Sequence, residues 1–91
     1  MAFSLIKEFT SFGSEIDLGA DADFVALVSM FPKKQLKELK VVTAGSGVLN
    51  FRASGIDMAM AGLTDGELIL VTGVTHIRTG TNVARLRVSW G

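Results

Sequence analysis

Apolar and polar residues alternate through residues 15–24, where every even position is apolar and four of the five odd positions are acidic. A period of two is typical of a strand with one buried face. We therefore expect a strand from residue 15 to about residue 30, in which Ile16, Leu18 and Phe24 point inward. Its outward carboxylates suit an edge strand, because charges there discourage pairing with another chain.

The second half of the chain combines β-branched residues with glycines, a composition typical of strands joined by turns. It predicts strands over 39–44, 47–52, 66–80 and 84–90. The sequences AGSG and RTGTN are the expected hairpin turns within the first and the last pair of these strands. Gly73 predicts a bulge or bend that lets one strand join both sheets of a sandwich. Residues 53–66 are expected to form a long loop or a weak edge strand.

The first thirteen residues carry apolar side chains at every third position, a spacing that fits a short helix better than a strand. The side chains are those of Phe3, Ile6, Phe9 and Phe12. Because exposed phenylalanine rings are costly, we expect residues 1–13 to be an N-terminal arm that docks on its own domain or on a neighbour. Residues 14–91 then form a single β domain. Pro32 is expected to open a short helix, with a basic loop as the alternative.

Together these patterns predict an all-β fold, a compact antiparallel sandwich or barrel with one short helix and an N-terminal arm. The chain has 91 residues and no cysteine, so neither disulfides nor thiolate metal sites can reinforce it. Its mean hydropathy of +0.43 is high for so small a monomer, which indicates apolar surface buried between subunits. No apolar run reaches the length of a membrane span, and Lys7 and Glu8 interrupt any signal peptide. We expect a soluble chain made in the cytoplasm.

The formal net charge is zero, which argues against nucleic-acid binding driven by phosphate contacts. Residues 1–31 carry one lysine against five acidic residues, and residues 32–52 carry five basic residues against one glutamate. These opposite blocks can pair within a subunit or between subunits, or they can form two solvated faces. For Asp21 and Asp23 we expect partners on a neighbouring subunit, namely Lys33, Lys34, Lys37 or Arg52.

No catalytic, cofactor-binding or metal-binding residue is predicted, and the chain is not expected to be an enzyme. Calcium-binding loops need oxygen ligands at fixed positions, and registers that start at Asp17 or Asp21 place glycine or apolar residues there. His76 has no local nucleophile signature and is expected at the surface or in an interface. Trp90 ends an alternating strand and is expected in the core or in an interface.

Short glycine-based motifs punctuate the C-terminal half of the chain. They are Thr43–Ala44–Gly45, the pair Gly62 and Gly66, and Thr79–Gly80–Thr81 followed by Ala84. In this order, over about residues 14–90, the sequence resembles small virion proteins of tailed phages, most of all the spike-base type found in phages and gene transfer agents. It departs from them in having ELILV where they have a proline, and in carrying FPKKQLKEL and the Phe-rich arm.

The resemblance implies a homo-oligomeric β protein, a trimer, docked on a major capsid protein or a fibre protein at the capsid surface. Its role would be that of a capsid decoration (cement) protein or a head spike-base protein, acting by packing and not by catalysis. The alternative is a stand-alone small β module that binds carbohydrate or peptide. Nucleic acid and membrane are not expected partners. The expected interface residues come from the arm and the charge blocks: Phe3, Ile6, Phe9, Phe12, Asp21, Asp23, Lys33, Lys34 and Lys37.

Overall fold

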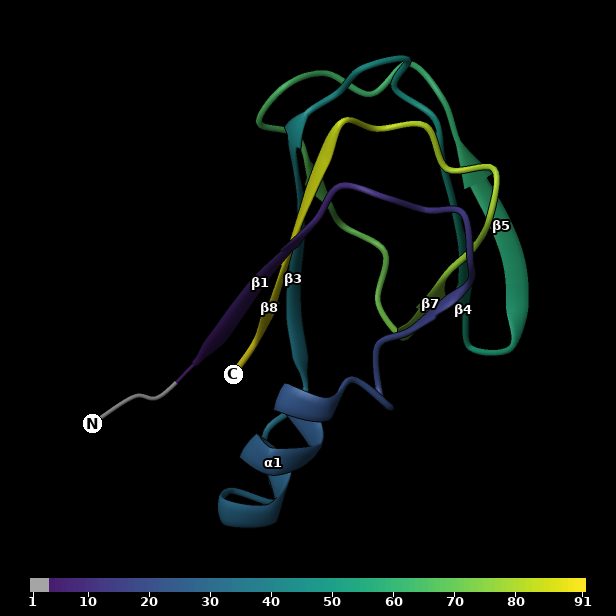
Figure 1. Ribbon diagram of the computed structural model, residues 1–91. Helices are drawn as coiled ribbons and strands as arrows, with labels where there is room; N and C mark the ends of the chain where they lie inside the picture. The colour runs from purple at the N-terminus through teal and green to yellow at the C-terminus, as the bar shows by residue number, and fades with distance from the viewer. Residues whose placement is uncertain (1–3) are drawn as a thin grey trace.

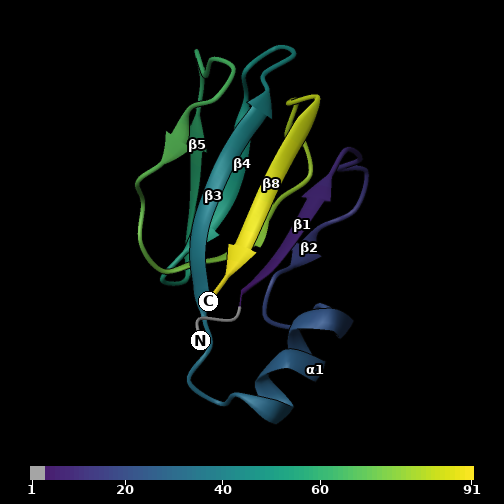
Figure 2. The same cartoon turned by 90° about the vertical axis from the view of Figure 1, so that its left-hand side faces the viewer.

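Two four-stranded antiparallel sheets pack face to face in the computed structural model, which describes residues 4–91 (Figure 1). The first sheet has the order β1–β8–β3–β6, with bounds Leu5–Phe9, Arg85–Trp90, Leu36–Thr43 and Leu68–Ile69. The second has the order β2–β7–β4–β5, with bounds Ile16–Asp17, Val74–Ile77, Leu49–Ala53 and Ile56–Met60. One helix, α1 (Ala22–Met30), projects from one end of the sandwich (Figure 2). The prediction of an all-β sandwich is confirmed.

The core lies between the two sheets and follows from the period-two pattern of the strands. Leu86, Val88 and Trp90 point inward from β8, and Leu49 and Phe51 point inward from β4. All five side chains are almost completely buried. Because β8 pairs with β1 on one side and β3 on the other, this strand is central to the first sheet.

The chain passes from the first sheet to the second at Gly73, as predicted, but the single strand expected over residues 66–80 is wrong, because β6 and β7 are two separate short strands. Gly73 lies between β6 and β7, which belong to different sheets, and its φ is +77°. A Cβ atom added there would lie 2.7 Å from Ser54 Oγ, so both the backbone conformation and the local space favour glycine.

The two predicted hairpin turns are wrong, because each connects strands of different sheets. AGSG joins β3 to β4, and RTGTN joins β7 to the segment that leads into β8. A two-residue hairpin instead joins β4 to β5 through Ser54 and Gly55, whose φ values of 52° and 78° suit a type I′ turn. Residues 56–60 are therefore an edge strand, one of the two alternatives predicted for this region.

The expected strand over residues 15–30 is wrong beyond Asp17. The Asp17 carboxylate accepts the N–H groups of Gly19 and Ala20, and this turn ends β2. The alternation of the sequence continues through Ala20 and Ala22, but both alanines are exposed. The alternation of apolar and polar residues therefore predicted a strand in a segment whose alternate side chains are not buried.

Helix α1 begins where Asp21 can cap it. Asp21 Oδ1 accepts the backbone N–H groups of Asp23 and Phe24, which have no partner within the first helical turn. Phe24 and Leu27 then lie three residues apart on the face that packs on the sandwich. The described part of the chain contains no helix long and apolar enough to cross a membrane.

Residues 5–9 form a strand, not the expected helix. β1 pairs antiparallel with β8, and Leu5 and Phe9 pack against the core. The helix expected after Pro32 is also absent from the described residues, because Pro32 and Lys33 form a turn and β3 already begins at Leu36. The residues assigned to an arm thus include an integral strand of the first sheet.

Candidate interaction surfaces

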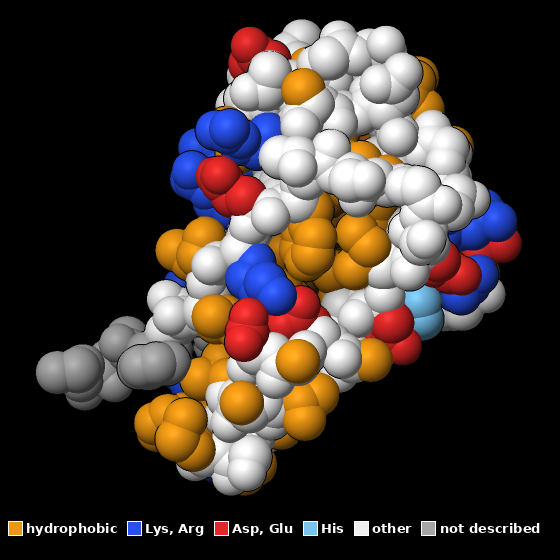
Figure 3. Space-filling view, in the orientation of Figure 1, with side chains coloured by type: hydrophobic (Ala, Val, Ile, Leu, Met, Phe, Trp, Pro, Cys, Tyr) orange, Lys and Arg blue, Asp and Glu red, His pale blue; other side chains and the backbone are white. Residues whose placement is uncertain are grey.

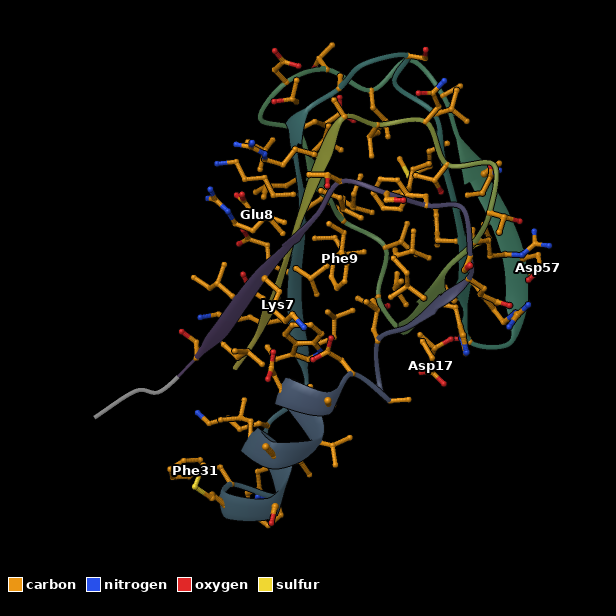
Figure 4. The ribbon with its side chains drawn as sticks, in the orientation of Figure 1. Lys7, Glu8, Phe9, Asp17, Phe31 and Asp57 are labelled. Atoms are coloured by element: carbon orange, nitrogen blue, oxygen red, sulfur yellow. The ribbon has the colours of Figure 1, made fainter. Side chains whose placement is uncertain are left out.

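Lys7, a residue of β1, forms ion pairs with Asp21 and Asp23 of the same subunit. Figure 4 shows the position of Lys7. Its Nζ lies 2.7 Å from Asp21 Oδ2 and 3.1 Å from Asp23 Oδ2. The Asp21 side chain is only 9% exposed and also caps α1, so it is not available to a neighbouring subunit. The expectation of an intersubunit role for Asp21 is therefore corrected. Asp23 is the outer, exposed member of this cluster.

The Lys7–Asp21 pair changes the pKa of both groups. Burial by itself would raise the pKa of Asp21, but hydrogen bonds from Lys7 and from the N–H groups of Phe24 and Asp23 outweigh it and lower that pKa. The hydrogen bonds to Asp21 and Asp23 raise the pKa of Lys7. Both groups therefore stay charged at neutral pH, and their attraction holds α1 against β1.

The basic residues expected opposite these aspartates lie elsewhere. Lys33 and Lys37 are exposed, and Lys34 Nζ lies 5.9 Å from the centre of the Phe31 ring. Within residues 4–91, no ion pair joins Lys33, Lys34 or Lys37 to an acidic group. These three lysines keep their positive charge available to a partner.

The outer faces of both sheets carry ion pairs formed within the subunit. On the second sheet, Arg52 lies 2.9 Å from Glu15 and 2.8 Å from Asp57. On the first sheet, Glu8 Oε2 accepts hydrogen bonds from Arg87 Nε and Nη2 at 3.1 and 2.9 Å. Much of the opposite charge that the sequence separates into blocks is thus brought together inside one chain.

His76 lies in a short polar row on the outer face of the second sheet. Its Nε2 is 3.4 Å from Asp17 Oδ2, and its Nδ1 is 2.8 Å from the hydroxyl of Thr75. This order of carboxylate, imidazole and hydroxyl is that of a nucleophile with its base. Here, however, Asp17 is half exposed and Thr75 donates to the carbonyl of Arg52, so the row has the features of surface packing. Among residues 4–91, no cluster of three or more acidic or histidine side chains could hold a metal ion.

The apolar side chains predicted to form an interface in the first thirteen residues lie in different environments. Phe12 is buried in the core, and Phe9 points from β1 into the space between the sheets (Figure 4). Their expected role in a subunit interface is corrected, since they pack inside their own subunit. Ile6 is exposed on the outer face of β1, where its interface role stays a prediction. Phe3 lies outside the described residues.

Large apolar side chains are exposed on α1 and directly after its C-terminal residue. Val25 is 52% exposed and Met30 is 67% exposed, and Phe31 follows them at the end of the helix. Figure 3 shows hydrophobic side chains gathered over this end of the molecule. We call Val25, Met30 and Phe31 the α1 tip. These residues were not among the predicted interface residues, because the segment was expected to be a strand. The run FVALVSM, which has no acidic residue, was the signal available.

Two adjoining hollows lie between the start of β3 and the segment that contains β7. One of 360 Å³ is bounded by Phe24, Leu36, His76 and Trp90, and a larger groove of 650 Å³ runs between residues 35–39 and 69–75. They share Gln35, Leu36, Val74 and Thr75. Trp90 is nearly fully buried and stacks on Phe24 at a centroid distance of 5.3 Å, so its ring face is already used.

The motif residues that carry the sequence resemblance lie in or beside the connections between strands, where they form hydrogen bonds. The N–H of Ala84 donates to the carbonyl of Thr43 at 2.9 Å, and the N–H of Ala44 donates to Asp65 Oδ1 at 2.7 Å. The Thr81 hydroxyl lies within hydrogen-bond distance of the backbone of Asn50 and Arg78. These motifs therefore fix connections between strands and do not form a binding site.

Comparison with known proteins found no protein-family model, no curated protein and no solved structure that matches this chain.

Proposed function

We propose that this protein is a structural subunit of a tailed-phage virion, either a capsid decoration (cement) protein or a head spike-base protein. It acts by packing as a homo-oligomer at the capsid surface, on a major capsid protein or a fibre protein. The α1 tip is the observation that carries this proposal, because it exposes large apolar side chains on a helix that projects from the body.

The charges around the α1 tip support docking to another protein. Lys33 and Lys34 follow the tip directly and make no ion pair with the described acidic residues. A hydrophobic centre with a polar rim is the usual anatomy of a protein interface. The motifs of the C-terminal half support a virion as the assembly, through their resemblance to phage virion proteins.

The direct test is the composition of purified particles from a phage that carries this gene. We expect an antibody against the protein to label the particle surface in electron micrographs. Loss of a decoration protein should lower the resistance of the capsid to heat and osmotic shock, whereas loss of a spike base should remove fibres. Absence of the protein from purified particles would overturn the proposal.

The docking surface can be tested on particles that lack the protein. We expect a Val25→Ser, Met30→Ser double variant to rebind less than the wild type. The matched control is Leu70→Ser, which changes a highly exposed leucine at the end of β6. Equal rebinding of the double variant and the wild type would exclude the α1 tip as the contact.

The hollow beside Trp90 supports a second candidate, a stand-alone module that binds carbohydrate or peptide. Sugar-binding sites usually present an aromatic ring face, and here the Trp90 ring stacks on Phe24 instead. A ligand in this hollow would displace Phe24 and change the fluorescence of Trp90, the only tryptophan. Titration with a panel of soluble oligosaccharides and short peptides, read by this fluorescence, separates the two candidates.

A further inference from the structure

β5 is the least protected of the four sheet edges in the described structure. The edge strands β2 and β6 have only two residues each. β1 carries an inward-pointing charge, Lys7, which is held by the acidic residues of α1. β5 has five residues without lysine, arginine or proline, and its one charge, Asp57, is paired with Arg52 of the adjacent strand β4. Figure 1 shows β5 at the outer margin of the second sheet. Such an edge invites pairing with another strand.

The core-facing side of β5 is also uncovered. Ile56 and Met58 pair with Ala53 and Phe51 of β4 and therefore point to the same side as the core. Ile56 is nevertheless 64% exposed and Met58 is 41% exposed. The first sheet ends in the two-residue β6 and does not cover these side chains. The open edge thus combines free backbone groups with a row of exposed apolar side chains.

The register of the β4–β5 hairpin determines which backbone groups face the open edge. Ala53 and Ile56 flank the two-residue turn and form a hydrogen-bonded pair, as in other hairpins of this type. Because successive residues of a strand direct their N–H and C=O groups to opposite sides, Asp57 and Ala59 direct theirs outward. These two residues are the donors and acceptors that a further strand would use.

A second β5 fits this edge in one register. With Met58 opposite Met58 on a two-fold axis, Asp57 of each copy lies opposite Ala59 of the other, and the outward backbone groups meet. Ile56 then lies opposite Met60, so apolar side chains face apolar side chains. Shifting this register by two residues in one direction places Asp57 opposite Asp57, so that like charges repel. Shifting it by two residues in the other direction places Asp57 opposite Ala61, which lies beyond the end of the strand.

We propose that the open edge of β5 pairs antiparallel with β5 of a second copy of this chain, which joins the two second sheets into one continuous sheet. A second copy is the partner because this register sets apolar side chains of residues 56–60 against apolar side chains and keeps the two Asp57 carboxylates apart. This inference rests on the proposed function, because both require a homo-oligomer. It specifies the β5 edge as the contact between subunits and a two-fold axis as their symmetry. A two-fold pairing gives a dimer, or an assembly built from dimers, and not an isolated trimer.

Crosslinking through a single introduced cysteine tests the register. The chain has no cysteine, so Met58→Cys places the only thiol on the two-fold axis. Cα atoms in such a non-hydrogen-bonded pair lie about 4.5 Å apart, within the range for a disulfide. We expect Met58→Cys to form a covalent dimer rapidly under mild oxidation, and Ile56→Cys, whose expected neighbour is Met60, to do so much more slowly. Equal rates for the two variants would overturn the proposed register.

A matched pair of charge variants at Ala59 tests the same pairing without a covalent bond. Ala59→Asp places a carboxylate opposite Asp57 in both symmetry-related pairs, whereas Ala59→Lys places an ammonium group there. We expect the dimer dissociation constant, measured by sedimentation equilibrium at low salt, to be roughly tenfold higher for Asp than for Lys. Far-UV circular dichroism and Trp90 fluorescence verify that each variant is folded.

Native mass separates this inference from the proposed function. A wild-type protein that is a strict monomer or an isolated trimer in solution, yet is found on particles, overturns the β5 pairing and leaves the virion role standing. A two-fold dimer that crosslinks through Met58→Cys but never occurs on particles supports the pairing and overturns the virion role.

Discussion

Asp21 combines two tasks in one side chain. One carboxylate oxygen accepts hydrogen bonds from the N–H groups of Asp23 and Phe24 at the start of α1. The other oxygen accepts a hydrogen bond from the ammonium group of Lys7 in β1. The helix start and the position of the helix on the sandwich therefore depend on the same residue. Asp23 shares the lysine at 3.1 Å, so Lys7 keeps one partner when Asp21 is changed.

Two substitutions separate these tasks. Asn caps helices about as well as Asp, so Asp21→Asn removes mainly the ion pair and should lower the free energy of unfolding by about 1 kcal/mol or less. Asp21→Ala removes the cap as well and should cost about 1–2 kcal/mol more. Urea unfolding at neutral pH measures both. Equal losses for the two variants would show that the cap contributes nothing.

The same pair predicts a pH dependence. The pKa of Asp21 is lower in the folded than in the unfolded chain, so its stabilisation is present at neutral pH and is lost as the pH falls through the folded pKa. The pKa of Lys7 is raised, so its contribution is lost only as the pH rises through its folded pKa in the alkaline range. The stability difference between wild type and Asp21→Asn should therefore shrink in acid. A constant difference from neutral pH into strong acid would contradict the ion pair.

Gly47 and Gly62 form a matched pair for backbone effects. Their φ values are +72° and +71°, but an added Cβ at Gly47 would lie 2.6 Å from the carbonyl oxygen of Leu63, whereas Gly62 has open space. Gly62→Ala should cost about 1 kcal/mol for the left-handed conformation alone. Gly47→Ala should cost clearly more, because backbone has to shift. Thermal unfolding of the two variants measures the difference, and equal melting temperatures would contradict it.

At the scale of elements, α1 is the part of the structure with the fewest anchors. It docks through Phe24 and Leu27 and through the Lys7 ion pairs, while its other face and its end are exposed. Much of its stability must come from packing, because an isolated helix of nine residues is too short to be stable in water.

Phe24 is therefore the anchor to test. Phe24→Ala removes the ring that stacks on Trp90 and should lower the free energy of unfolding by about 2 kcal/mol, less than for a fully buried phenylalanine. The emission spectrum of Trp90 in this variant should shift to longer wavelengths as the indole ring becomes hydrated. The control is Val25→Ala on the exposed side of the same helix, which should leave both the stability and the spectrum nearly unchanged. An unchanged spectrum in Phe24→Ala would contradict the stacked arrangement.

At the scale of the whole molecule, both sheets share one core. The buried side chains of all eight strands and α1 belong to or pack against a single cluster that includes Trp90 and Phe51. The strand order interleaves distant segments, since β8 lies between β1 and β3. Removing one sheet would leave the other with an exposed apolar face.

We therefore expect unfolding to be a single cooperative transition. Far-UV circular dichroism, which reports the strands, and Trp90 fluorescence, which reports the core beside α1, should give the same midpoint in urea. The measurement belongs at a protein concentration low enough to keep the chain monomeric. Separate midpoints would mean that α1 unfolds before the sandwich.

Features that depend only on neighbouring residues could be predicted from the sequence. The β-branched runs and the period of two located the strands of the C-terminal half, Gly73 marked the passage between sheets, and Trp90 was placed in the core or in an interface. These features were predictable because strand alternation and the left-handed conformation of glycine are local properties of the chain.

Which segments contact one another depends on the tertiary fold. Lys7 pairs with Asp21, and Glu8 pairs with Arg87 at the other end of the chain. The distribution of charge along the sequence suggested that opposite groups attract but could not select these partners, since strand order sets the distances. The same holds for residues 22–30, which alternate like a strand for three residues yet form a helix. There the cap at Asp21 and the contact between Phe24 and Trp90 stabilise the helix, and neither is visible as a period in the sequence.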